Sequence, residues 1–270
     1  MRRLLLLSNS TNHGERYLGH AADEIVDLLA SCRRVLFVPF ALHDRAGYTA
    51  KFRTRLEELG RSVDELAADA TGRRQIETAE AVFVGGGNTF RLLKTLQEAE
   101  LLAPLRERAL AGMPYLGASA GINLAGPTIR TTNDMPIVEP HGFDALGLVP
   151  FQINPHYLDA DSGSTHMGET RAERIAEYHE ENGATVVGLR ERAWIRVEGA
   201  RSWLGGERGA CIFRRGSAPE ERSTGDALDD LLLQVVVGGC IGLLLGELLL
   251  ARLGHPAVAD PVALAIRVGE

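Results

Sequence analysis

The segment Gly117-Ala118-Ser119-Ala120-Gly121 places a serine among small residues, directly after the apolar pair Tyr115-Leu116. This G-x-S-x-G pattern is typical of a nucleophile elbow, a strained strand-to-helix turn that lifts a serine hydroxyl out of a sheet. The helix that follows would present free N–H groups and a positive dipole end to a developing oxyanion. The alternative is a small-residue turn in which Ser119 only caps the helix. The pattern by itself leaves both interpretations open.

A second glycine-rich segment, Gly85-Gly86-Gly87-Asn88-Thr89, also lies between an apolar run and a helix-like stretch. It lacks the lysine of a Walker motif and does not form G-x-G-x-x-G, which weakens a phosphate-binding interpretation. Its backbone N–H groups would also suit an oxyanion, because glycine permits close approach of a substrate. A structural turn, a phosphate site and an oxyanion donor all remain open.

A nucleophilic serine needs a base, and the base needs an orienting acid. Of eight histidines, His156 follows a strand-like run and Pro155, which would restrain its loop, and His141 remains open. Several carboxylates lie in plausible loops, and their spacing does not choose among them: Asp134, Glu139, Asp159, Asp161 and Glu191.

The elements that would position these residues alternate between apolar runs and helical patterns. The short apolar runs suit strands of a mostly parallel sheet buried on both faces, and they lie at 4–7, 35–40, 81–84 and 115–116. Helices are expected over 48–59 and 89–96, the second capped by Asn88. This alternation predicts an α/β fold with helices flanking the sheet. A further helix is expected over 168–180, followed by antiparallel strands at one margin of the sheet, at 185–189, 193–197, 202–204 and 210–213.

Composition excludes several classes of protein. The formal net charge is −7 and no block of Lys or Arg stands out, so nucleic acid is not expected as a partner. Three widely spaced cysteines predict neither a disulfide framework nor a zinc site. The four leucines after Arg3 are too few for a secretory signal, which needs an apolar stretch of about 7–15 residues. We therefore expect a cytoplasmic protein.

Residues 221–270 do not continue the α/β pattern and are interpreted as an extension to a catalytic domain formed by 1–220. The run 231–253 is apolar and close to the roughly 20 residues that span a bilayer as a helix. Gly238, Gly242 and Gly246 recur every fourth residue, which suits helix pairing in lipid or in a soluble homodimer. A buried extra helix and a sequence end without a selected role are the alternatives, and membrane anchoring is not the favoured one.

Four motifs together resemble the peptidase E family of α-aspartyl dipeptidases, whose wider group includes cyanophycinases. They extend the two glycine segments and occur in the family's order, as Gly85–Phe90, Gly117–Asn123, Thr132–Ile137 and Asn154–Tyr157. The resemblance runs from about Leu4 to about Arg215. It implies a fold similar to the glutaminase domain of class I amidotransferases and a catalytic triad of Ser119, His156 and Glu191.

The resemblance also implies a function and further site residues. The activity would be hydrolysis of dipeptides with N-terminal aspartate through an acyl-enzyme on Ser119, without a metal or organic cofactor. The N–H groups of Gly87 and Ala120 would hold the oxyanion. Arg171, Asn88 and Asp134 would bind the substrate, with Arg171 on the aspartate side chain. A surface ion pair for Arg171 and a turn cap for Asp134 are the structural alternatives. The functional alternatives are a cyanophycinase-like β-aspartyl hydrolase and a non-catalytic binding protein.

Overall fold

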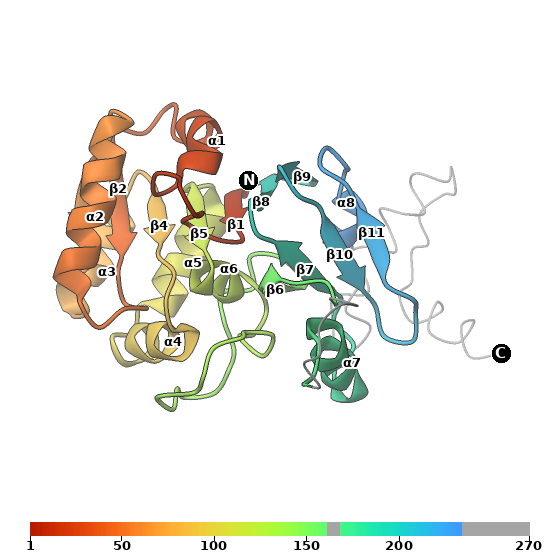
Figure 1. The fold of residues 1–270 in the computed structure, drawn as a ribbon. Coiled ribbons are helices and arrows are strands. Elements are labelled where there is room, and N and C mark those ends of the chain that lie inside the picture. The colour runs from red at the N-terminus through yellow and green to blue at the C-terminus, as the bar shows by residue number, and fades with distance from the viewer. Residues whose placement is uncertain (161–167, 234–270) are drawn as a thin grey trace, which may run out of the picture. The chain divides into compact units, whose positions relative to one another are not determined.

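The structure is a computed structural model that describes residues 1–160 and 168–233. Within the described residues the strands form two sheets (Figure 1). The larger sheet has the strand order β3-β2-β4-β5-β1-β8-β9. Its strands are β1 (Arg3–Leu7), β2 (Arg34–Val38), β3 (Ser62–Glu65), β4 (Val82–Val84), β5 (Tyr115–Ala118), β8 (Ala193–Glu198) and β9 (Arg201–Gly206). The first five strands in that order pair in parallel, and β8 and β9 are antiparallel at one margin.

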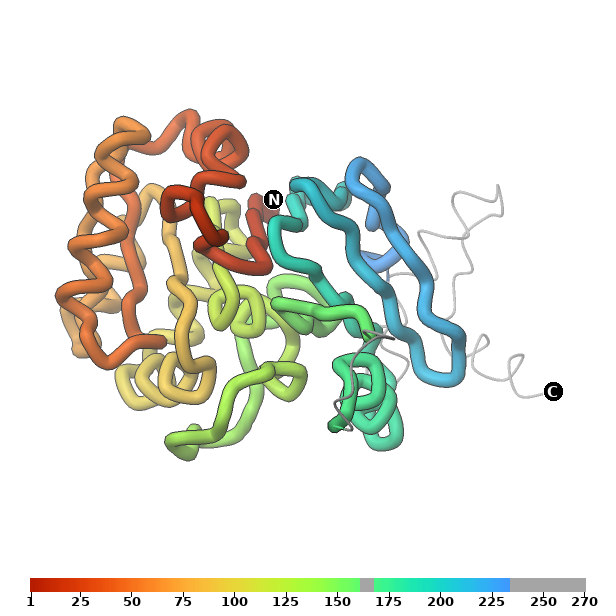
Figure 2. Tube along the Cα trace, viewed as in Figure 1, coloured from red at the N-terminus to blue at the C-terminus, as the bar shows by residue number. Residues whose placement is uncertain are grey.

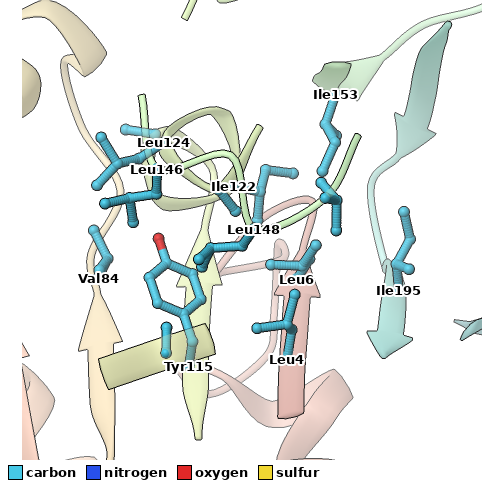
Figure 3. Packing of buried hydrophobic residues seen from close by; sticks show 14 of the residues in the cluster. Leu4, Leu6, Val84, Tyr115, Ile122, Leu124, Leu146, Leu148, Ile153 and Ile195 are labelled. Atoms are coloured by element: carbon cyan, nitrogen blue, oxygen red, sulfur yellow. The ribbon is translucent and has the colours of Figure 1, made fainter. Parts of the chain in front are cut away.

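The central strands β1, β4 and β5 of the larger sheet are buried on both faces, as their apolar runs predict. In β1, Leu4 and Leu6 pack into one hydrophobic cluster while Leu5 and Leu7 pack into another. One cluster includes residues of α1 (Ala22–Leu28), which follows the short 3-10 turn η1 (Gly19–Ala21), and of α2 (Arg45–Glu58). The other includes residues of α3 (Ala70–Thr78), α4 (Thr89–Glu98), α5 (Leu102–Ala111) and α6 (Ala120–Ala125). Figure 3 shows this second cluster, in which Tyr115 and Ile122 lie close to β1.

The smaller sheet has the order β11-β10-β7-β6. Its strands are β6 (Gln152–Tyr157), β7 (Val186–Arg190), β10 (Ala210–Phe213) and β11 (Glu220–Arg222). The expected antiparallel margin is therefore correct for β8 and β9, whereas β7 and β10 pair antiparallel with each other in the smaller sheet and not at the margin of the larger one. The reason is pairing: β7 pairs in parallel with β6, and β10 pairs with β7 rather than with β9. Helix α7 (Arg171–Glu181) contributes Ile175 to a cluster with Val186 and Phe213 of this sheet.

Helix boundaries follow local capping. Helix α4 begins after Asn88, whose side chain accepts from the N–H of Arg91, so the predicted cap is confirmed. Helix α7 begins at Arg171 rather than at 168, because Thr170 and Glu173 form a capping box that defines the first turn.

The compact unit extends from Met1 to Leu232. It includes β11 and α8 (Asp229–Leu232), with Leu228 and Leu231 fully buried, although the sequence pattern had assigned 221–232 to the extension. Nearly all of the apolar run 231–253, on which the membrane and dimer interpretations depend, lies outside the described residues. In the described part of the chain, no helix is both long and apolar enough to cross a membrane. Figure 2 shows that β1, near the N-terminus, lies between β5 and β8, two strands that come much later in the chain.

Candidate active site

Ser119 lies in a strained turn at the end of β5. Its φ of 52° and ψ of −110° are unusual for a residue with a side chain. The turn requires small neighbours: a Cβ on Gly117 would lie 2.7 Å from the Gly121 carbonyl oxygen, and one on Gly121 would collide with the Val84 carbonyl oxygen. Ser119 occupies the cap position of α6, but its hydroxyl caps nothing. The capping alternative for this serine is therefore wrong.

The Ser119 hydroxyl instead begins a chain of hydrogen bonds. Its Oγ lies 3.0 Å from Nε2 of His156, and Nδ1 of His156 lies 2.9 Å from Oε1 of Glu191. A proton on Nδ1, donated to the Glu191 carboxylate, leaves Nε2 as the acceptor for the serine hydroxyl. The structure thus brings together the three residues of the predicted triad, in the geometry of an activated nucleophile.

His156 and Glu191 reach Ser119 from the smaller sheet. β6 and β7 run in parallel, so their carboxyl ends meet at one edge. His156 lies near the end of β6, where the register shifts between Pro155 and Tyr157, and its φ is 53°. Such a bulge redirects a side chain. Glu191 directly follows β7.

The second glycine segment approaches the elbow. A Cβ built on Gly86 would lie 3.0 Å from the Cβ of Ser119, so this loop passes directly beside Ser119. Gly87 has a φ of 133°, which disfavours any residue with a side chain. Ala120 is the first residue of α6, so its N–H has no acceptor within the helix. Ala120 therefore directly follows Ser119 at the start of α6, and Gly87 belongs to the loop whose Gly86 lies beside Ser119.

Asn88 and Asp134 hold the start of α4. Asn88 accepts from the Arg91 N–H and donates to the Met135 carbonyl oxygen at 2.8 Å, so both ends of its amide are engaged. Oδ2 of Asp134 accepts from the N–H and the hydroxyl of Thr89, at 2.8 and 2.5 Å. Within the described residues, Oδ1 of Asp134 forms no such bond. These contacts give both side chains a structural role next to Gly87.

Arg171, the first residue of α7, contacts Asn133 rather than a carboxylate of its own helix. It donates to Oδ1 of Asn133 at 2.7 Å, and Asn133 donates to the carbonyl oxygen of Pro155, next to His156, at 2.7 Å. No carboxylate of the described ranges pairs with Arg171, so the expected alternative of an ion pair with Glu173 or Glu177 is wrong. Burial and, less strongly, the charge of Arg174 lower the pKa of Arg171. Among the described residues, no carboxylate neutralises its charge.

A cleft of about 560 Å³ lies beside these residues and is lined by Asp134 and Thr132, by Phe90 of α4 and by Arg174 of α7. The triad itself is not part of its lining. Across the described part of the chain, no group of three or more His, Cys, Asp or Glu side chains is arranged to hold a metal ion.

Comparisons with known proteins show the family of the chain. The family model "Peptidase family S51" matches residues 4–204. The chain belongs to this peptidase family. It is 55% identical to "Peptidase E" of Streptomyces coelicolor over 229 residues, which are 85% of this chain and 94% of the relative. It is 49% identical to "Probable alpha-aspartyl dipeptidase" of Drosophila melanogaster, over 82% of this chain and 93% of the relative.

Solved structures share the fold of this family S51 chain. A putative peptidase E protein of Listeria monocytogenes matches with a TM-score of 0.61 and 25% identity, over 77% of this chain and 99% of that one. A peptidase from an acI-B1 Actinobacterium matches with a TM-score of 0.65 and 17% identity, over 84% and 96% of the two chains.

Sequence reasoning missed Asn133 as the link between Arg171 and the strand that carries His156. Its signal in the sequence is its place in the Thr132–Ile137 motif, next to the charged residue Asp134. Sequence reasoning also missed the polar residues Ser8 and Asn9. Their position directly after a buried strand could have identified them, because side chains that follow parallel strands gather at the edge of the sheet where binding sites form.

Proposed function

We propose that this chain is a serine exopeptidase that hydrolyses dipeptides with N-terminal aspartate, Asp-X. The observation that carries the proposal is the hydrogen-bond chain from Ser119 through His156 to Glu191, with distances of 3.0 and 2.9 Å. Membership of peptidase family S51 and the names of the two relatives support this substrate class. Cys32 and Cys211 are buried free thiols, which suits the reducing cytoplasm as its compartment.

In this mechanism Ser119 acts as the nucleophile. Its Oγ attacks the carbonyl carbon of the scissile bond while Nε2 of His156 takes the hydroxyl proton. Glu191 stabilises the resulting imidazolium through Nδ1. Collapse of the tetrahedral intermediate breaks the peptide bond, and His156 returns its proton to the departing amine. Water, deprotonated by His156, then releases aspartate from the acyl-enzyme.

The glycine loop and the start of α6 stabilise the negative oxygen of the intermediate. We assign the N–H groups of Gly87 and Ala120 to this role because their loops meet at Ser119. Asn88 supports that role without contacting the substrate. Its amide NH₂ and its amide oxygen each hold the loop or α4 through a hydrogen bond.

Arg171 supplies selectivity for aspartate. A half-buried guanidinium without a carboxylate partner in the described residues gains a charge-assisted hydrogen bond when an acidic side chain binds. The second oxygen of Asp134 would accept from the free α-amino group of the substrate. This pair of opposite charges suits a short peptide with both a free amine and an acidic first side chain.

The test is hydrolysis of Asp-Leu, β-Asp-Leu, Glu-Leu and Ala-Leu by the full-length protein and by its Ser119→Ala variant. We expect cleavage of Asp-Leu with a strong preference over the other three, and its loss in the variant. Preferred cleavage of β-Asp-Leu would instead establish the β-aspartyl hydrolase alternative. A folded protein that cleaves none of the four would contradict the proposal and favour a binding protein.

A further inference from the structure

Ser8 lies directly after β1, between the two sheets, and is fully buried. Its Oγ donates to the Leu189 carbonyl oxygen at 2.8 Å and accepts from the His156 N–H at 2.9 Å. Leu189 lies in β7, two residues before Glu191. One hydroxyl group therefore contacts the backbones of both strands that carry the base and the acid.

The contact with His156 matters because the backbone is strained there. His156 combines a positive φ with the register shift of β6 against β7. A residue with a side chain persists in this conformation only when its surroundings enforce it. The N–H of His156 leaves the ladder at the bulge, and Ser8 provides its acceptor. Ser8 thus stabilises the conformation in which the imidazole reaches Ser119.

Asn9 makes an equivalent contact on the other side of Glu191. Its Oδ1 accepts from the N–H of Arg192 at 2.9 Å, and Arg192 has a positive φ of 67°. The Asn9 amide is oriented by donation to Oδ1 of Asn12 at 2.6 Å. The turn that carries Glu191 is therefore held before the acid by Ser8 and after it by Asn9.

The same segment also contacts the nucleophile. The N–H of Ser119 donates to the Leu7 carbonyl oxygen at 3.1 Å. Residues 7–9 consequently hydrogen-bond to the backbone of Ser119, of His156 and of both flanks of Glu191. Among the hydrogen bonds of the described residues, no other segment reaches the backbone near all three of these residues.

We propose that Ser8 and Asn9 are positioning residues that align His156 and Glu191 with Ser119. The proposal rests on the proposed catalytic roles of those three residues. Ser8 acts through the backbone of His156, and Asn9 acts through the turn that carries Glu191.

The test compares full-length wild type with Ser8→Ala, Ser8→Thr and Asn9→Ala. Two rates are measured: kcat for Asp-Leu, and covalent labelling of Ser119 by a fluorophosphonate, in which the serine oxygen bonds to phosphorus and fluoride leaves. We expect Ser8→Ala to lower both rates by about 10- to 100-fold, because a displacement of about 1 Å costs on that order. KM should change by less than about twofold, since substrate contacts remain. Ser8→Thr keeps the hydroxyl and should recover most of the lost rate.

Ser202→Ala is the matched control. Ser202 is a buried serine of β9 in the larger sheet, and its hydroxyl has no hydrogen-bond partner in the described structure. Wild-type rates in Ser8→Ala, or an equal loss in Ser202→Ala, would overturn the positioning role. Circular dichroism shows whether Ser8→Ala folds. If it does not, Asn9→Ala becomes the test. An unchanged kcat in Asn9→Ala overturns the proposal, and a reduced kcat with an unchanged KM supports it. Wild type that is neither active nor labelled would instead overturn the proposed function.

Discussion

The two sides of the candidate active site are built by different means. On the side of the larger sheet, Ser119 is held by close packing, with Gly117 and Gly121 against neighbouring backbone and no room for a further carbon. On the side of the smaller sheet, the side chains of His156 and Glu191 are 37% and 52% exposed, and long-range hydrogen bonds hold their backbones. Close packing against backbone therefore determines the geometry of Ser119, whereas hydrogen bonds between distant segments determine the geometry of His156 and Glu191.

This difference has a consequence for mutations. Changes in the elbow should act mainly through stability, because they introduce clashes into a packed core. Substitutions of the proposed catalytic and substrate-binding side chains on the side of the smaller sheet should act mainly through kcat or selectivity. These side chains are partly exposed, so replacing them changes the packing little.

Glu191→Gln should have the largest effect and should act on catalysis alone. The amide keeps the size of the side chain but removes the charge that stabilises the imidazolium, so we expect kcat for Asp-Leu to fall about 10³- to 10⁴-fold. KM and the melting temperature should stay near wild type. Glu77→Gln, at an exposed carboxylate of α3, is the control. A kcat within tenfold of wild type would mean that Glu191 does not act as the acid.

Arg171→Gln should reduce selectivity rather than general activity. Loss of a charge-assisted hydrogen bond costs about 1.5–3 kcal/mol, so kcat/KM for Asp-Leu should fall on the order of 10- to 100-fold. Any residual hydrolysis of Ala-Leu should be unchanged. Arg34→Gln removes an exposed arginine of β2, which pairs with Asp64, and should leave both substrates unaffected. An equal loss for both substrates in Arg171→Gln would contradict recognition of the aspartate side chain.

Gly121→Ala tests the other side of the comparison. The added methyl group collides with the Val84 carbonyl oxygen, so the free energy of unfolding should fall by about 1–3 kcal/mol. Urea denaturation measures this change. Gly183→Ala is the control, because an added Cβ there meets nothing within 4 Å. If the two variants were equally stable, the elbow would be less tightly packed than the structure indicates.

Asp159→Asn should have the smallest effect, and it should depend on pH. Arg190 of β7 donates to both carboxylate oxygens of Asp159, at 2.8 and 2.6 Å, and these hydrogen bonds lower the pKa of Asp159. A lowered folded-state pKa contributes stability above the unfolded pKa, and this is lost as the pH falls through the folded value. Because the carboxylate is largely exposed, the variant should be less stable by under about 1 kcal/mol near pH 6.

Denaturation near pH 3 provides the check on Asp159. The difference between wild type and Asp159→Asn should be smaller there than near pH 6, since protonation removes the same charge as the substitution. A difference that does not change with pH would show that the ion pair does not link β6 to β7 energetically.

Sequence patterns predicted the parts of this protein that depend on neighbouring residues. The elbow, the cap of α4 by Asn88 and the doubly buried strands follow from short segments, because the small residues, the capping side chain and the apolar runs that predict them each lie within a few residues. The assignment of β7 and β10 to one margin was wrong because strand order depends on pairing between distant segments, which alternation of apolar residues does not encode.

The sequence by itself determined the α/β class, a serine at a strained turn and, through the resemblance of four motifs, the choice of His156 and Glu191. Only the tertiary structure decided that Glu191, among several loop carboxylates, contacts His156, that Arg171 turns toward Asn133, and that Ser8 joins both sheets. The physical reason is the range of the interactions. The small residues that a strained turn requires are adjacent in the sequence, whereas a hydrogen bond between segments far apart in sequence exists only after the sheets have formed.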